Sequence, residues 1–275
     1  MEKLRIALWV AVVFGLAGLV ACNDKDTDQQ QTRASKAVAG QQPAVQKPAE
    51  KPEADEGEEG EEGPATPAAV AAEKPAPQQT SGKQFVYNFD SDTPGQLPAK
   101  FHSAKTGGGT EEKWSVVADP TAPSKPNVVA QTSTDQTDYR FPLLICDEGS
   151  FQDLGLSIKF KAVSGSIDQA GGLVFRLRDP NNYYVVRANA LENNYRLYHV
   201  VNGRRSQFAG ANFKVTSGDW HELRVEVVGN KITCYYDGVK KIEATDGTFK
   251  DAGKVGLWTK ADSVTYFDGL TVTAK

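Results

Sequence analysis

Planar polar side chains are concentrated between residues 176 and 199, and their types could bind sugars. Aromatic rings offer stacking surfaces, while guanidinium and amide groups offer hydrogen bonds of fixed geometry. We predict a carbohydrate-binding face whose side chains are Arg176, Tyr183, Arg187, Asn189 and Tyr195. The alternative is an outer face of long side chains that cover apolar surface, because periodicity alone does not assign the faces of a sheet.

His199 is the candidate catalytic residue, because an imidazole titrates near neutral pH and can act as a general base. The alternative is a structural role, which is commoner for a lone histidine on a strand. Retaining glycoside hydrolysis needs two carboxyl groups about 5 Å apart. Glu222 and Glu226 share a strand face, but Arg224 lies between them, so we interpret these three residues as a solvated face.

The elements that must position these residues are β-strands. Short alternating runs end at turn signals such as Asn202-Gly203 and Asp237-Gly238, which are strong hairpin signals. No stretch has a sustained helical period. The expected strands cover residues 85–89, 114–117, 156–161, 223–227, 231–236, 239–244, 254–259 and 264–272, and the middle strands carry residues 176–178, 183–189 and 195–199. Residues 84–275 are therefore predicted to form one all-β, antiparallel two-sheet sandwich. The formal net charge of −4 does not favour a nucleic-acid partner, which calls for a basic domain.

The N-terminus reads as a secretory signal peptide over residues 1–21, with Lys3 and Arg5 before an apolar run that is short for a membrane span. The segment Leu19-Val20-Ala21-Cys22 resembles the lipobox of bacterial lipoproteins. This resemblance implies a lipid on Cys22, attachment to a membrane and a place in the bacterial cell envelope. In lipoproteins of enteric bacteria an Asp after the cysteine retains the protein at the inner membrane. Asn23 stands at that position here, so the resemblance favours localisation to the outer membrane. The alternative is an ordinary signal peptide with a chance cysteine.

Residues 22–83 are predicted to be a disordered tether. They are rich in Pro, Ala and Glu, and residues 52–64 form an acidic run, so this segment buries too little apolar surface to offset its ordering entropy. Proline and like charges extend such a chain. The expected role of the tether is to hold the domain away from the lipid surface. The alternative role for the acidic run is binding of a metal or a protein.

Several segments of the domain resemble the concanavalin A-like lectin/glucanase superfamily. They are AGGLVFR (170–176), NNYYVVR (181–187), WHELRV (220–225), YDG (236–238), GKVGLW (253–258) and FDG (267–269). Within it, the chain is most similar to laminin-G-like and 3-keto-disaccharide hydrolase domains. The resemblance implies a jelly roll of two sheets, one of them concave.

The resemblance leaves three functions open. The Glu-x-Asp-x-Glu motif of family-sixteen glucanases is absent, which favours glycan binding over ordinary hydrolysis. A hydrolase or lyase acting on a glycoside or 3-keto-glycoside is the second hypothesis, with His199 as base and Arg187 as cation. A laminin-G-like protein adhesion domain is the third.

The resemblance also raises a structural calcium ion, as in related jelly rolls whose two ends meet. Asp90, Asp92 and Asp268 would supply the oxygen ligands that calcium prefers. The alternative is that these acids cap strands and turns.

Cys146 and Cys234 are the cysteines that remain after the anchor. An exported protein permits a disulfide between them, but two cysteines do not prove their own proximity. We expect free thiols, because Cys234 shares a strand face with Ile232 and Tyr236 and fits a buried position. No zinc-ligand spacing is present.

Overall fold

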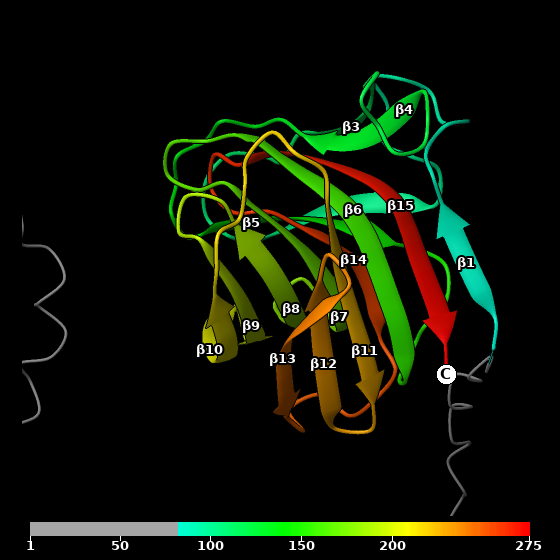
Figure 1. The fold of residues 1–275 in the computed structure, drawn as a ribbon, viewed down its shortest axis with the longest axis vertical. Coiled ribbons are helices and arrows are strands. Elements are labelled where there is room, and N and C mark those ends of the chain that lie inside the picture. Colours follow the sequence, from blue (N-terminus) through cyan, green and yellow to red (C-terminus); the bar gives the residue numbers. More distant parts are fainter. Residues whose placement is uncertain (1–81) are drawn as a thin grey trace, which may run out of the picture. The chain divides into compact units, whose positions relative to one another are not determined.

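Two antiparallel sheets form a jelly-roll sandwich in residues 82–275, the part of the chain that the computed structural model describes (Figure 1). The predicted all-β sandwich is therefore confirmed. Predictions for the signal peptide, for Cys22 and for nearly all of the tether lie outside the described residues. Within residues 82–275, no helix is long and apolar enough to cross a membrane.

Seven of the strands of the eight-stranded sheet follow one another in space, and β15 is an interior strand of this sheet. They are β13 (Val239–Thr245), β12 (Lys231–Tyr236), β11 (His221–Val228), β6 (Leu154–Ser164), β15 (Val264–Ala274), β4 (Asn127–Gln131) and β3 (Trp114–Ala118). A further strand, β1 (Gln84–Tyr87), pairs with β15.

The seven-stranded sheet carries most of the predicted site residues. Its spatial order is β10 (Arg204–Asn212), β9 (Asn194–Val201), β8 (Asn182–Asn189), β7 (Ala170–Asp179), β14 (Lys254–Trp258), β5 (Arg140–Cys146) and β2 (Phe101–Gly107). The sequence prediction did not identify β2, β4 or β5.

Alternation of apolar residues builds the core between the two sheets. On β6, Leu156 and Ile158 are almost completely buried, and they pair across the sheet with Val225 and Leu223 of β11. Burial of such a side chain stabilises the fold by roughly 1.5–3 kcal/mol. The intervening residues of both strands are partly exposed, so the predicted alternation in this sheet is confirmed.

Buried apolar residues lie on both faces of the seven-stranded sheet. Its outer face, turned away from the other sheet, carries a second buried cluster that includes Phe141, Val174, Tyr183, Tyr198 and Trp258. Strand β5 is consequently buried at all seven positions. A strand that is buried on both faces lacks alternation, which explains why the sequence pattern misses it.

Two predicted hairpin turns are confirmed. Asn202 and Gly203 join β9 to β10 with φ of 50° and 77°, and Asp237 and Gly238 join β12 to β13 with φ of 48° and 75°. Two successive positive φ values match the type I′ turn, whose twist suits a two-residue hairpin.

The cysteines of the described part are free and buried, as expected. Cys146 lies in β5 and Cys234 lies in β12, so they belong to different sheets. Burial raises the pKa of both thiols.

Candidate functional site

Three aromatic side chains form a platform on the outer face of the seven-stranded sheet. The aromatic platform consists of Phe141 of β5, Tyr198 of β9 and Trp258 of β14. The rings of Phe141 and Trp258 stack with centroids 5.3 Å apart. The guanidinium of Arg205 lies over all three rings, 4.6 Å from the centroids of Phe141 and Tyr198 and 5.7 Å from that of Trp258.

A buried ion pair lies on the same face. Lys260 Nζ is 3.0 Å from Asp168 and 2.6 Å from the exposed Asp138, and Asn189 donates a 2.7 Å hydrogen bond to Asp168. Burial raises the pKa of Asp168, although the charge of Lys260 opposes that effect. Burial lowers the pKa of Lys260, but the two aspartates outweigh it and raise that pKa overall. Lys260 is therefore a fixed cation.

Arg187 connects the platform with a partly exposed carboxylate. Its Nη2 is 2.7 Å from Glu192 and 3.0 Å from the hydroxyl of Tyr198, and its Nη1 donates to Asn194. Burial raises the pKa of Glu192, but Arg187 and Asn194 outweigh it and hold that pKa below its usual range. Glu192 is thus a reachable carboxylate that stays ionised at neutral pH.

The loop after β14 fixes the position of Asp168. Asp262 accepts hydrogen bonds from the backbone amides of Ser166, Ile167 and Asp168, at 2.7, 3.0 and 3.0 Å. Burial raises the pKa of Asp262, but these bonds outweigh it and lower that pKa overall. The carboxylate of Asp262 therefore fixes the loop before β7, and this positions Asp168 beside Lys260.

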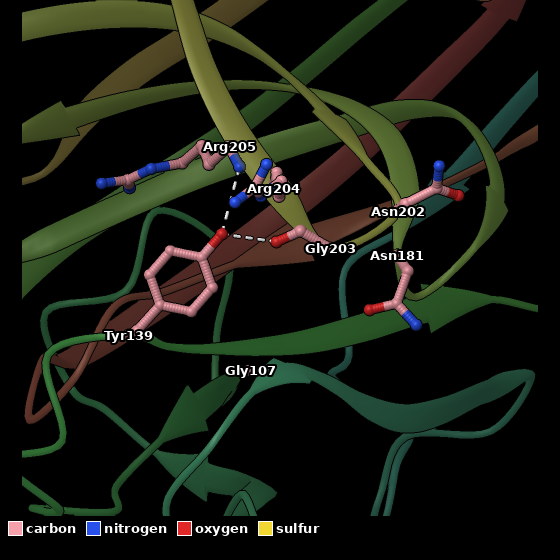
Figure 2. A pocket seen from close by; sticks show the side chains of 7 residues that line it. All are labelled: Gly107, Tyr139, Asn181, Asn202, Gly203, Arg204 and Arg205. Carbon is pink, nitrogen blue, oxygen red and sulfur yellow. Dashed lines mark hydrogen bonds between the residues drawn. The ribbon is translucent and has the colours of Figure 1, made fainter.

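A pocket of about 540 Å³ opens where the turns of this sheet meet (Figure 2). Its lining residues are Gly107, Tyr139, Asn181, Asn202, Gly203, Arg204 and Arg205. Figure 2 shows the hydroxyl of Tyr139 between two groups of the β9–β10 hairpin: it donates to the carbonyl of Gly203 and accepts a 3.1 Å hydrogen bond from the backbone amide of Arg205. Tyr139 itself is 45% exposed. The pocket therefore combines an accessible ring with four side chains that can donate hydrogen bonds.

Three of the predicted binding residues share this outer face. Arg187 and Asn189 belong to the polar network beside the platform, so the structure brings them together as expected. Tyr183 faces the same way, but its hydroxyl is buried 2.8 Å from that of Thr106. Burial raises the pKa of Tyr183 to about 12. Tyr183 is therefore a buried packing residue of the outer face, and its hydroxyl bonds within the protein.

The prediction that Arg176 and Tyr195 lie on the face of Arg187 is wrong. Tyr195 packs in the core between the sheets, and its hydroxyl donates to the carbonyl of Tyr235. Arg176 has φ of 46°, next to a register shift in the pairing of β7 with β8. A β-bulge of this kind breaks the two-residue period, and the Arg176 side chain instead donates to backbone carbonyls of Gln152, Gly229 and Phe249.

His199 and Arg187 do not form an acid–base pair. They lie on opposite faces of the sheet. His199 pairs with the core residue Tyr184, whereas Arg187 is three positions from Tyr184 on β8, an odd separation that turns its side chain to the other face, beside Tyr198. His199 stacks on Phe208 at 5.5 Å and lies 3.5 Å from Asp246. The predicted cooperation of His199 and Arg187 is therefore wrong.

The residues expected to hold calcium do not fit that ion. Both carboxylate oxygens of Asp268 accept hydrogen bonds from Ser124, and burial raises the pKa of Asp268. The carboxylates of Asp90 and Asp92 also accept hydrogen bonds, from the backbone amides of Asn127 at 3.3 Å and Ala99 at 3.0 Å. Among residues 82–275 there is no group of three or more acidic, histidine or cysteine side chains that could hold a metal.

Sequence reasoning missed much of the site. It did not select the aromatic platform or the residues Asp138, Tyr139, Asp168, Glu192 and Lys260. One signal was available: the segment Trp258-Thr259-Lys260-Ala261-Asp262 places an aromatic residue and two charges directly at the end of a strand.

The fold and the site together define a jelly-roll β-sandwich with a polar and aromatic outer face. The sequence matches the 3-keto-alpha-glucoside-1,2-lyase-like domain over residues 95–273, and the chain belongs to this family. No curated protein matches.

Two solved structures share the fold. The carbohydrate-binding module CBM66 from Bacillus subtilis is 19% identical, with a TM-score of 0.50, over 62% of this chain and 95% of that one. The cellulose-induced protein Cip1 is 10% identical, with a TM-score of 0.52, over 70% of this chain and 97% of that one. At these identities the likeness concerns the fold alone.

Proposed function

We propose that the outer face of the seven-stranded sheet binds carbohydrate. The observation that carries this proposal is the joint presence of an accessible tyrosine, the guanidinium of Arg205 and the exposed carboxylate of Glu192 around the aromatic platform. An aromatic face suits the apolar side of a sugar ring, and planar donors and acceptors suit its hydroxyl groups. The family and the fold support the same class of ligand.

A lyase acting on 3-keto-glycosides is the second candidate, because the family carries that description. In such an elimination a base removes the proton on C2, which the neighbouring ketone acidifies. The C1–C2 double bond then forms while the bond from C1 to the leaving oxygen breaks, and that oxygen takes up a proton. Glu192, ionised and reachable, is the base that this face offers, and Lys260 is a cation that could stabilise the enolate oxygen.

NMR of the full chain with plain glycosides and 3-keto-glycosides separates these functions. Ligand line broadening without new products supports binding alone. Product resonances that disappear in Glu192→Gln and persist in Glu222→Gln make the protein a lyase. The control residue Glu222 pairs with Lys159 in the other sheet. If the spectra show neither line broadening nor product resonances, both proposals are overturned and protein adhesion is favoured instead.

We further propose that the chain is a lipoprotein of the bacterial cell envelope, held at the outer membrane through Cys22. The lipobox-like segment supports this proposal, and several acyl chains give stable anchoring where one does not. Cell fractionation tests it: the chain should be recovered with outer membranes, and Cys22→Ala should release it. Recovery of the native chain in the soluble fraction would contradict the anchor.

A further inference from the structure

We propose that this face prefers glycans that carry an anionic group, such as a uronic acid carboxylate or a sulfate, and that Arg205 recognises that group with help from Arg204. This inference rests on the proposed carbohydrate binding and names the class of sugar.

The first observation is how Arg205 is held. Its guanidinium lies within 4.6 Å of two ring centroids and 5.7 Å of a third. Contact with rings occupies the flat face of a guanidinium and leaves its N–H groups, which lie in the plane, free to donate. A carboxylate or sulfate accepts such donors in parallel pairs. Arg205 is thus pre-oriented, so little side-chain entropy is lost on binding.

The second observation is that nothing in residues 82–275 neutralises Arg204 or Arg205. Other arginines of this part have acceptors: Arg176 bonds to Asp153, Arg178 to Asp251, and Arg187 to Glu192. No described carboxylate lies within ion-pair distance of Arg204 or Arg205, and Nη1 of Arg205 is buried without an acceptor among the described residues. A cation in a partly desolvated place attracts an anion more strongly than it would in water.

The third observation is the lining of the pocket. The charged side chains that line it are both arginines, and its polar neighbours Asn181, Asn202 and Tyr139 suit sugar hydroxyls. Acids in adjoining segments are already engaged. Asp138 pairs with Lys260, and Asp179 accepts hydrogen bonds from the turn that follows it. The pocket therefore presents a net positive charge to a ligand.

Calorimetric titration of the full chain tests this preference with three matched oligosaccharides: an oligogalacturonide, its carboxyl-reduced neutral form, and the neutral form bearing sulfate. We expect the oligogalacturonide to bind about tenfold to hundredfold more tightly than its neutral form, as charged hydrogen bonds imply, and the gap to shrink as salt is raised. The sulfated oligosaccharide distinguishes a sulfate from a carboxylate ligand. If it binds as tightly as the oligogalacturonide, the site recognises negative charge, and if it binds more weakly, the site recognises a planar carboxylate.

Variants assign the effect to Arg205. The preference for the anionic oligosaccharide should vanish in Arg205→Gln. It should fall in Arg205→Lys, which keeps the positive charge but loses the paired N–H donors of the guanidinium. The matched control is Arg178→Gln, because Arg178 also lies over a ring, that of Phe249 at 5.1 Å, but has Asp251 as partner. Thermal unfolding checks that each variant is folded. If Arg205→Gln does not fold, Arg205→Lys becomes the test of the preference.

Two results would overturn the inference in distinguishable ways. If neutral and acidic forms bind equally, or Arg205→Gln keeps the preference, the anionic specificity is wrong while carbohydrate binding stands. If no oligosaccharide binds the native chain, the proposed function fails along with it.

Discussion

Buried arginines in this protein serve two different purposes. Arg140 is completely buried and donates to backbone carbonyls of Thr110, Glu111 and Ala261, so it fastens loops together. Arg176 does the same for three other segments. Arg187 instead joins side chains of the candidate site. The residue type is identical in each case, so the sequence cannot separate a fastening arginine from a binding one.

Replacement of Arg176 by Met should lower the free energy of unfolding by about 3 kcal/mol or more, because several buried carbonyl groups lose their donors. Urea unfolding of the variant measures this loss. Arg178→Met is the matched control, since Arg178 is 44% exposed in its side chain and should change stability by less than about 0.5 kcal/mol. Loss of glycan binding in folded Arg176→Met, with stability unchanged, would restore Arg176 as a binding residue.

Asp262→Asn should destabilise the protein by about 2–3 kcal/mol at neutral pH, since a charged acceptor of backbone amides becomes neutral. The pKa of Asp262 is lowered in the folded state. Its contribution is therefore complete above the unfolded pKa and is lost as pH falls below about 4 through the lower folded value. Urea unfolding across pH should show the native and variant curves converging in acid, and a constant gap would refute this role.

At the scale of strands, alternation predicted the faces correctly where the ladders are regular. Arg187 and Asn189 of β8 share a face as the sequence predicts. The prediction fails on β7, because register shifts between Phe175 and Asp179 turn Arg176 out of phase. It also fails on β5, where burial of both faces removes the alternation. A bulge depends on the partner strand as much as on its own residues, so no pattern within one strand reveals it.

His199→Ala should leave glycan affinity within about twofold of the native value. His199 lies on the opposite face of β9 from Tyr198, so its removal changes the core-facing contacts with Phe208 and Asp246. Titration with the best ligand of the panel measures the affinity, and unfolding reports the local loss of packing. A large drop in affinity at unchanged stability would show that the ligand reaches the other side of the sheet.

At the scale of the whole molecule, the general form of the fold was accessible from the sequence and much of the site was not. Turn residues and alternating runs predict a two-sheet sandwich, and these signals are local. The candidate site draws on β5, β8, β9, β10, β14 and the segments between them. Trp258 and Phe141 stack although they are far apart in the chain, and only the pairing of β14 with β5 brings them together.

Thiol titration should count the described cysteines only after unfolding. Cys146 and Cys234 are 1% and 0% exposed, and their raised pKa values disfavour the reactive thiolate. In native buffer neither should react with a disulfide reagent, and in denaturant two thiols should appear without prior reduction. A third thiol that reacts in the native state would be Cys22, and its presence would contradict acylation at that residue.

The last strand of the described part holds the eight-stranded sheet together. Strand β15 pairs with β6 on one side and with β4 and β1 on the other. The β1 pairing joins Gln84 to Thr273, which closes a loop of almost the entire domain, and such distant contacts form slowly. Strand β15 follows the other described strands in the chain, so a ribosome completes it after them and β1 and β4 lack this partner until then. The eight-stranded sheet can therefore close only once the chain through β15 has been synthesised.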